Sequence, residues 1–250
     1  MGTSQSSTGP NGSSSLVPPW ADDQSAQPQI EPETARYKGF RQSLGRFVSG
    51  GYDGDLKRAV GHYARKSSGG SASAVRRLGS VTQAGAGLYG VLFGIAENSG
   101  EITVDIDNIT GQACEYAISE ITQTLTTDDG DSEKIRAAMN YALVEALDGV
   151  EIFDPEHITD DIIVDTMIGY LSESIFLQIV MDSGKAWNKA ETPNEAIRAE
   201  TGLRELIKVV VDKHLAPRFA KNVRSFSQKQ VVQIEKNAII DVWKEWEAYQ

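Results

Sequence analysis

Two short stretches of this sequence have residue types and spacings that resemble known chemical sites. Residues 85–90 read GAGLYG and match the G-x-G-x-x-G pattern of a dinucleotide-binding turn, but that fingerprint needs a strand before its first glycine. The preceding residues 77–83 are not strand-like, so we expect close helix packing through small side chains instead. Residues 128–133 read DDGDSE and share only their composition with a calcium loop, because the ligand positions are out of register.

The remaining reactive side chains form no recognisable catalytic or metal-binding set. The three histidines lie far apart in the sequence, and there is no G-x-S-x-G nucleophile elbow. The single cysteine, Cys114, lies on a helical pattern beside alanines, which is typical of a small core residue. We therefore predict a protein that is not an enzyme and that binds no cofactor and no metal ion.

The N-terminus offers chemistry of a different kind. A small residue after Met1 permits removal of that methionine, which would expose the amine of Gly2. An unhindered amine on a long flexible arm can enter the active site of another protein. Residues 1–6 also fit the M-G-x-x-x-[ST] pattern of N-myristoylation, although a single acyl chain anchors a protein only marginally.

A short apolar island follows within the same polar segment. Residues 16–20 read LVPPW, and their two prolines favour an extended, polyproline-like backbone. An aromatic residue at the end of such an island, here Trp20, is a suitable anchor for a groove on a partner protein. The alternative is an apolar spot in a disordered tail, and composition does not decide between the two.

Composition and charge divide the chain into three segments. Residues 1–34 are rich in Ser, Gly, Pro, Gln and Thr, so we expect a long disordered N-terminal arm. Residues 36–80 carry ten Lys and Arg against two acids, whereas residues 81–250 carry fourteen against twenty-nine. The basic segment either packs on the acidic body or faces an anionic partner. The net charge of −11 argues against a simple nucleic-acid binder.

From Tyr37 onward the pattern of apolar residues is helical and predicts an all-α domain. Two helix starts have capping patterns, at Thr192 with Glu195 and at Ser227 with Gln230. Residues 101–107 show a brief alternation that we interpret as an extended linker. The expected helices cover residues 55–66, 71–78, 81–96, 111–125, 132–147, 159–182, 193–214 and 228–249.

These elements suggest a domain organisation and a compartment. We predict an arm over 1–34, a basic helical segment over 35–98 and an acidic helical body over 99–250, with 35–250 as a single domain as the alternative. No stretch approaches the roughly 20 apolar residues that span a bilayer, and no secretory signal is recognisable. One cysteine cannot form an internal disulfide bond. We therefore expect a cytoplasmic protein.

The first third of the chain resembles the QatB family, the B component of the four-gene Qat anti-phage defence system. The resemblance lies in MGTS at 1–4, LVPPW at 16–20, the stretch YKGFRQSLGRFVSGGYDGDLKRAVGHYARKSSGGSASAVRRLGS at 37–80, and AGAGLYG at 84–90. It covers about residues 1–95. Beyond these residues the likeness is only that of an acidic helical body.

The resemblance implies partners and a role. The system pairs this component with an ATPase, an enzyme similar to the 7-cyano-7-deazaguanine synthase QueC, and a TatD-like nuclease. QueC-like enzymes of defence systems are implicated in attaching a deazaguanine base to a protein N-terminus. On this resemblance the chain is an adaptor and substrate: Gly2 is the acceptor, the partner enzyme reads Thr3 and Ser4, and a groove holds residues 16–20, namely Leu16, Val17, Pro18, Pro19 and Trp20.

A different class of function rests on the basic segment. In this alternative the chain is a helical module that binds nucleic acid through residues 36–77. Its affinity for nucleic acid would depend strongly on salt, and binding would be lost when the basic side chains are neutralised. The residues expected to contact the anionic partner are Arg65, Lys66, Arg76 and Arg77. We rank this hypothesis second because the rest of the chain is acidic.

Overall fold

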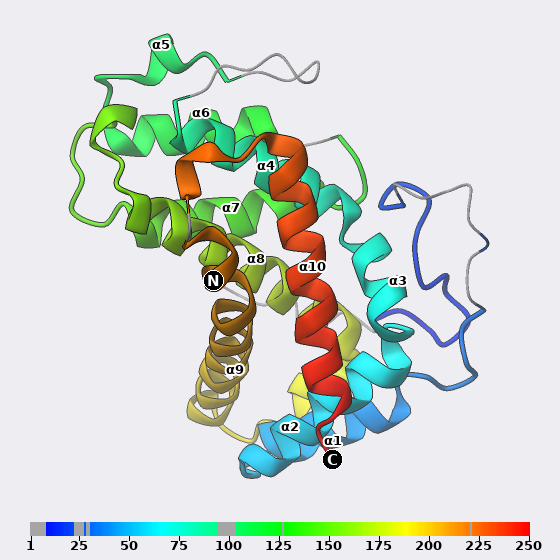
Figure 1. Ribbon diagram of the computed structural model, residues 1–250. Coiled ribbons are helices and arrows are strands. Elements are labelled where there is room, and N and C mark those ends of the chain that lie inside the picture. Colours follow the sequence, from blue (N-terminus) through cyan, green and yellow to red (C-terminus); the bar gives the residue numbers. More distant parts are fainter. Residues whose placement is uncertain (1–8, 23–27, 29–30, 95–103, 127, 221) are drawn as a thin grey trace. The chain divides into compact units, whose positions relative to one another are not determined.

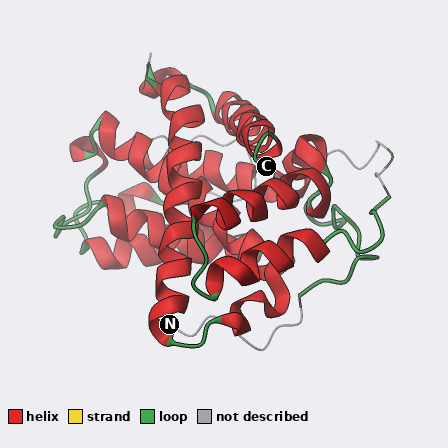
Figure 2. Cartoon of the chain, turned by 90° about the horizontal axis from the view of Figure 1, so that it is seen from below, coloured by secondary structure: helices red, strands yellow, loops and turns green. Residues whose placement is uncertain are grey.

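The computed structural model describes residues 9–22, 28, 31–94, 104–126, 128–220 and 222–250. Within these residues every named element is helical, and an isolated bridge between Ala113 and Ile152 is the one β-type pairing (Figures 1 and 2). The all-α class is therefore confirmed. The α-helices are α1 (Lys38–Val48), α2 (Asp53–His62), α3 (Gly70–Arg77), α4 (Gly79–Leu92), α5 (Ile106–Ile109), α6 (Cys114–Leu125), α7 (Ser132–Ala146), α8 (Asp160–Ser183), α9 (Pro193–Phe219) and α10 (Gln228–Glu247).

Four shorter helical turns join these elements. They are the π-helical turn η1 (Tyr63–Ser67) and the 3₁₀ turns η2 (Pro155–His157), η3 (Gly184–Lys189) and η4 (Val223–Ser225). Gly184 has φ of 55°, in the left-handed region that glycine adopts without strain. It follows the last residue of α8 directly, so the chain can leave that helix and enter η3.

Local sequence signals set several helix starts. The amide of Glu195 donates to Oγ1 of Thr192 at 3.2 Å, and Oε2 of Glu195 accepts from the amide of Thr192 at 3.2 Å. The same reciprocal bonds join Ser227 and Gln230 at the start of α10. These are capping boxes, in which each side chain satisfies a backbone amide that has no helical partner. Both predicted starts are confirmed.

The chain divides into two compact units built from separate segments. Unit 1 comprises residues 1–77, 175–210 and 239–250, and unit 2 comprises residues 78–174 and 211–238. Helices α8, α9 and α10 therefore each contribute residues to both units.

An aromatic cluster forms the core of unit 1. The ring of Tyr63 lies 5.0 Å from that of Phe40 and 6.4 Å from that of Trp243, and the rings of Trp243 and Trp246 are 5.1 Å apart. All four side chains are buried. Nε1 of Trp243 donates to Oγ of Ser68 at 2.8 Å, so the indole keeps a polar partner inside the core. This cluster joins the N-terminal helices to the end of α10.

Unit 2 is closely packed around α4. An added Cβ at Gly85 would lie 2.5 Å from Oε1 of Glu235, and one at Gly87 would lie 3.0 Å from Cδ2 of Leu125. The GAGLYG stretch thus lies inside a helix and allows close packing, as predicted, and no strand precedes it. Small residues are needed at Gly85 and Gly87 because neighbouring side chains occupy the space.

One of the described helical stretches, Asp160–Lys189, is long and apolar enough to cross a membrane by length and composition. The sequence predicts a helix over 159–182, but polar residues are scattered through it, so it has no continuous run of about 20 apolar residues. Of its most apolar window, 78% is buried within the chain. Such burial is typical of the core helix of a soluble protein.

Candidate functional site

The N-terminal arm is the segment to which the sequence assigns most of the function. The acceptor Gly2 and its neighbours Thr3 and Ser4 lie outside the described residues. The description begins at Gly9, and the arm from Gly9 to Asp22 belongs to unit 1. We refer to residues 9–22 as the anchored arm, because they contact the rest of unit 1.

The LVPPW island divides into a buried half and an exposed half. Leu16 and Val17 are buried, Pro18 is half-buried, and Pro19 and Trp20 are exposed. The island therefore attaches itself to its own chain through its aliphatic residues and leaves the aromatic residue, 52% exposed, facing solvent.

Leu16 is seated where the backbone of unit 1 has no side chain. An added Cβ at Gly69 would lie 2.7 Å from Cδ1 of Leu16, and Gly69 has φ of 77°. A glycine is needed here both for its backbone conformation and for the approach of the leucine. The anchored arm then turns, with the amide of Ala21 donating to the carbonyl of Pro18 at 3.1 Å, and Ala21 is also buried.

A buried ion pair fastens the end of the anchored arm. The guanidinium of Arg76 donates to both carboxylate oxygens of Asp22, at 2.7 and 3.0 Å. The Arg76 and Asp22 side chains are only 9% and 2% exposed. Arg76 also donates to the carbonyl of Pro28 at 3.0 Å. Bidentate arginine–carboxylate pairs combine energy with a fixed geometry, so this pair defines the path of the arm over α3.

Two further arginines contact the start of the anchored arm. Arg41 donates through Nη2 to the carbonyl of Pro10 at 2.8 Å and through Nε to the carbonyl of Asp182 at 3.0 Å. Arg36 is buried and donates to the hydroxyl of Tyr37 at 2.9 Å. Both guanidinium groups lie over the Tyr37 ring, within 5 Å of its centroid. Burial raises the pKa of Tyr37 to about 12, so its hydroxyl stays neutral.

The carboxyl of Asp182 is the centre of the polar core beneath these arginines. It is buried and accepts from the hydroxyl of Tyr63 at 2.7 Å and from Nε2 of Gln178 at 3.1 Å. Burial raises the pKa of Asp182, and the two donors oppose that shift because they stabilise the charged form. Burial also raises the pKa of Tyr63. These hydrogen bonds hold Asp182, whose backbone carbonyl accepts from Arg41.

The four basic residues proposed to contact an anionic partner have different surroundings. Arg65 donates to the carbonyls of Glu247 and Tyr249 at 2.5 and 2.6 Å, near the C-terminus. Lys66 pairs with Glu33 at 3.3 Å. Arg76 is shared with Asp22, and Arg77 is half-buried. These four basic residues do not form one exposed surface, because Arg76 is buried and Arg77 is half-buried.

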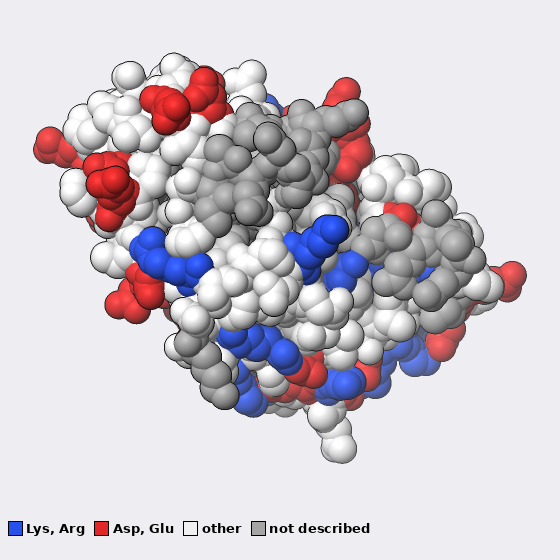
Figure 3. Space-filling model, turned by 45° about the horizontal axis from the view of Figure 1, so that its top comes forward, with Lys and Arg blue, Asp and Glu red and all other residues white. Residues whose placement is uncertain are grey.

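Acids of the N-terminal segment compensate part of the basic segment. Both Asp22 and Glu33 belong to the first 35 residues, and each pairs with a base of residues 36–80. Lys, Arg, Asp and Glu side chains are unevenly distributed over the face drawn in Figure 3. Charge complementarity between arm and basic segment therefore adds to the apolar contacts of Leu16 and Val17.

No group of three or more His, Cys, Asp or Glu side chains in the described part of the chain is placed to hold a metal ion. Cys114 is buried, and burial raises the pKa of its thiol. A buried, protonated thiol is a poor nucleophile. The residues that sequence reasoning missed are Arg36, Arg41 and Asp182; no local motif marks them, because their partners lie far away in the sequence.

Comparison with known proteins adds the family. The family model of the Qat anti-phage system associated protein QatB matches residues 69–246. No curated protein and no solved structure matches this sequence. The match overlaps the resemblance noted in residues 1–95 and extends it through the helical body. Because it covers well over half of the chain, this protein belongs to the QatB family and is a component of the Qat anti-phage defence system.

Proposed function

We propose that this chain is a non-enzymatic cytoplasmic adaptor whose N-terminal arm docks on, and is modified by, a QueC-like partner enzyme. The ATPase of the same system is the second proposed partner, and a TatD-like nuclease the third. The family match supports membership in a multi-component system. The MGTS terminus, with Gly2 as the acceptor, supports the site of modification.

The observation that carries the proposal is where the anchored arm begins. Arg41 binds the carbonyl of Pro10, Leu16 and Val17 are buried, and Arg76 binds Asp22. Gly2 precedes Gly9, the first described residue, by seven residues, and such a segment spans at most about 25 Å when fully extended. The anchored arm thus sets an outer limit for the distance between the acceptor amine and unit 1.

Trp20 supports docking at a second point. It is 52% exposed, while both the preceding Val17 and the following Ala21 are buried. An exposed tryptophan on a fixed backbone costs little entropy when it enters a partner's pocket, and aromatic anchors are frequent hot spots of interfaces. We propose that the partner enzyme contacts Trp20 while it acts on Gly2.

Mass spectrometry tests the proposal. The chain is expressed with and without the QueC-like partner, and its intact mass and N-terminal fragments are measured. We expect a partner-dependent adduct on Gly2 in the wild type. Deletion of residues 2–8 leaves the anchored arm intact and should abolish the adduct. The Gly2→Leu variant keeps the length of the arm but retains Met1, so it should also remain unmodified.

Trp20→Ala separates docking from chemistry. We expect a smaller modified fraction at limiting enzyme, with the acceptor amine unchanged. Circular dichroism serves as the control for folding in all variants. A terminus that is only trimmed of Met1 in both samples would refute modification of the arm, and an adduct on a residue other than Gly2 would refute Gly2 as the acceptor.

The nucleic-acid module is the less supported alternative. Arg76 is buried against Asp22, and Arg65 and Lys66 have partners within the chain. Neutralising Arg65, Lys66 and Arg77 while keeping Arg76 tests it without breaking the arm. Binding of DNA or RNA at low salt that these substitutions abolish would favour this alternative.

A further inference from the structure

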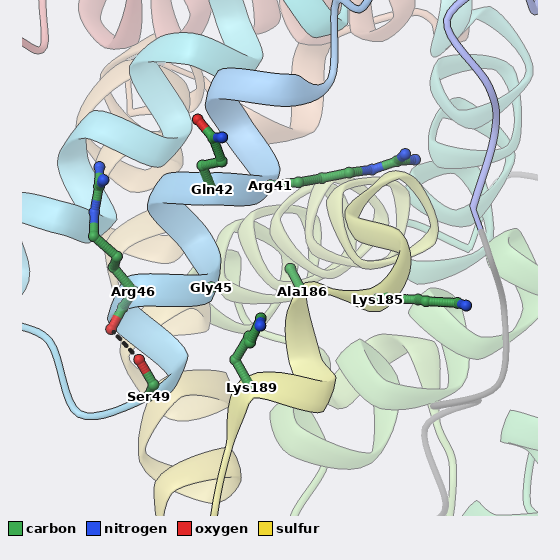
Figure 4. A pocket seen from close by; sticks show the side chains of 8 residues that line it. All are labelled: Arg41, Gln42, Gly45, Arg46, Ser49, Lys185, Ala186 and Lys189. Atoms are coloured by element: carbon green, nitrogen blue, oxygen red, sulfur yellow. Dashed lines mark hydrogen bonds between the residues drawn. The ribbon is translucent and has the colours of Figure 1, made fainter.

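Unit 1 contains a cavity lined by basic side chains. Its volume is about 580 Å³, and it lies between α1 and η3. Figure 4 shows Arg41, Gln42 and Arg46 on α1, with Lys185 and Lys189 on η3. None of the described residues that line it is acidic. Four positive charges around one cavity stand out in a chain whose net charge is −11.

The charges of this cavity are poorly compensated. Lys185 and Lys189 are exposed and have no acidic partner among the described residues. Of the four cations, only Arg46 contacts a carboxylate within the described part of the chain, that of Asp55 at 3.3 Å. Like charges around one cavity repel each other, and a bound anion would remove that repulsion.

Arg41 is the most constrained of the four cations. Its bonds go to the carbonyls of Pro10 and Asp182, which are neutral acceptors. The carboxyl of Asp182 is occupied by Tyr63 and Gln178. Burial lowers the pKa of Arg41, and attraction to Tyr37 and Asp182 offsets only part of that shift. A guanidinium fixed in this way is preorganised to receive a planar or tetrahedral anion.

The cavity has the size of a small-molecule site. Pockets for small ligands occupy roughly 300–1,000 Å³. Gly45 keeps this one open: an added Cβ would lie 3.3 Å from Cγ of Lys189 and 3.9 Å from the carbonyl of Ala186. Gln42 adds an amide that can both donate and accept, which charged groups alone do not provide.

We propose that this cavity binds a phosphorylated small molecule of nucleotide size. The two lysines and Arg41 hold the phosphate groups, and Gln42 contacts the uncharged part of the ligand. Gly9 of the arm lies at the edge of this site, because an added Cβ at Gly9 would lie 2.7 Å from Nη2 of Arg41 and 2.9 Å from Cα of Gly184. The proposal does not depend on modification of Gly2.

Titration calorimetry on the full chain tests the site. The probes are ATP, inorganic pyrophosphate and a short single-stranded oligonucleotide. We expect ATP to bind, with pyrophosphate weaker, and the double variant Lys185→Ala/Lys189→Ala to lose about tenfold or more in affinity, because charge-assisted bonds are removed. The matched control is Lys38→Ala/Lys57→Ala, which removes the same charge from exposed lysines of unit 1 outside the cavity; its affinity should change less than about twofold.

A second variant separates shape from charge. Gly45→Val narrows the cavity between α1 and η3 without changing its charge and should also weaken ATP binding, while the melting temperature reports on folding. Absence of ATP binding to the wild type would overturn the proposal, as would equal losses in the cavity pair and the control pair. An oligonucleotide that binds at least tenfold more tightly than ATP through the same lysines would assign the cavity to nucleic-acid phosphate and refute a small ligand.

Discussion

Each unit buries several carboxyl groups, and two of them, Asp182 in unit 1 and Glu235 in unit 2, have opposite surroundings. Asp182 of unit 1 accepts hydrogen bonds from Tyr63 and Gln178. Glu235 of unit 2 is fully buried, and neither of its carboxyl oxygens has a hydrogen-bond partner among the described residues. Burial raises the pKa of both groups, but that of Glu235 rises well above its ordinary value.

The two buried carboxyl groups differ in what they connect. Of the two donors to the Asp182 carboxyl, Gln178 lies on the same helix and Tyr63 lies 119 positions away. The backbone carbonyl of Asp182 also accepts from Arg41, which is 141 positions away and contacts the arm. Unit 1 therefore uses polar groups to join distant segments and to place the arm. Glu235 joins nothing and lies against Gly85, where its neutral form avoids the cost of a buried charge.

The largest expected effect concerns Glu235. Because its folded-state pKa is raised, its contribution favours the folded chain below its ordinary pKa of 4.5 and is lost as the pH rises towards the folded-state value. Replacing it by Gln removes that loss. We expect the variant to gain on the wild type by about 1.4 kcal/mol for each pH unit over this range. Urea unfolding at a series of pH values measures the difference.

Asp182→Asn is the control that sharpens this comparison. The folded-state pKa of Asp182 is also raised, so the sign of the effect is the same. Its donors stabilise the charged form, and we therefore expect a weaker pH dependence than for Glu235. Equal pH dependence in the two variants would show that the hydrogen bonds of Asp182 do not distinguish the units.

The next effect tests the ion pair of the anchored arm. Arg76→Met leaves Asp22 buried without its partner, and breaking such a pair costs about 3 kcal/mol or more. The variant can avoid the cost of a buried, unpaired Asp22 carboxylate if the arm leaves unit 1. We expect lower stability in urea together with faster proteolysis between residues 9 and 22. The double variant Asp22→Leu/Arg76→Met should recover most of the stability, and an Arg76→Met chain with unchanged stability and proteolysis would contradict the assigned role.

Sequence reasoning succeeded where the signal is local. The capping boxes at Thr192 and Ser227 and the helical repeat of apolar residues fix helix starts within a few residues, because their partners are three or four positions away. The contacts that hold the anchored arm could not be predicted in the same way. Arg41 and Asp182 are 141 positions apart, and Arg76 and Asp22 are 54 apart, so only the fold brings them together.

The arm shows the same limit. Its composition predicts disorder, and composition averages over residues that behave differently. Leu16 packs on unit 1 because Gly69 leaves space for it, and Val17 is also buried, whereas Trp20 stays exposed. The island LVPPW was recognised from its apolar residues, but which of them faces the chain and which faces solvent depends on a glycine that lies fifty-three positions away from Leu16.

The smallest effect compares single hydroxyl groups in the two units. Tyr63→Phe removes one of the two donors to Asp182, and Tyr170→Phe removes the bond of Tyr170 to the carbonyl of Val81 in unit 2, at 2.8 Å. Both rings are buried, so the substitutions match in packing. A bond to a carboxyl group contributes more than a bond to a neutral carbonyl, and we expect losses of about 2 and about 1 kcal/mol. Urea unfolding at neutral pH measures both. A larger loss for Tyr170→Phe would show that the hydrogen bond to Asp182 in unit 1 is not the stronger of the two.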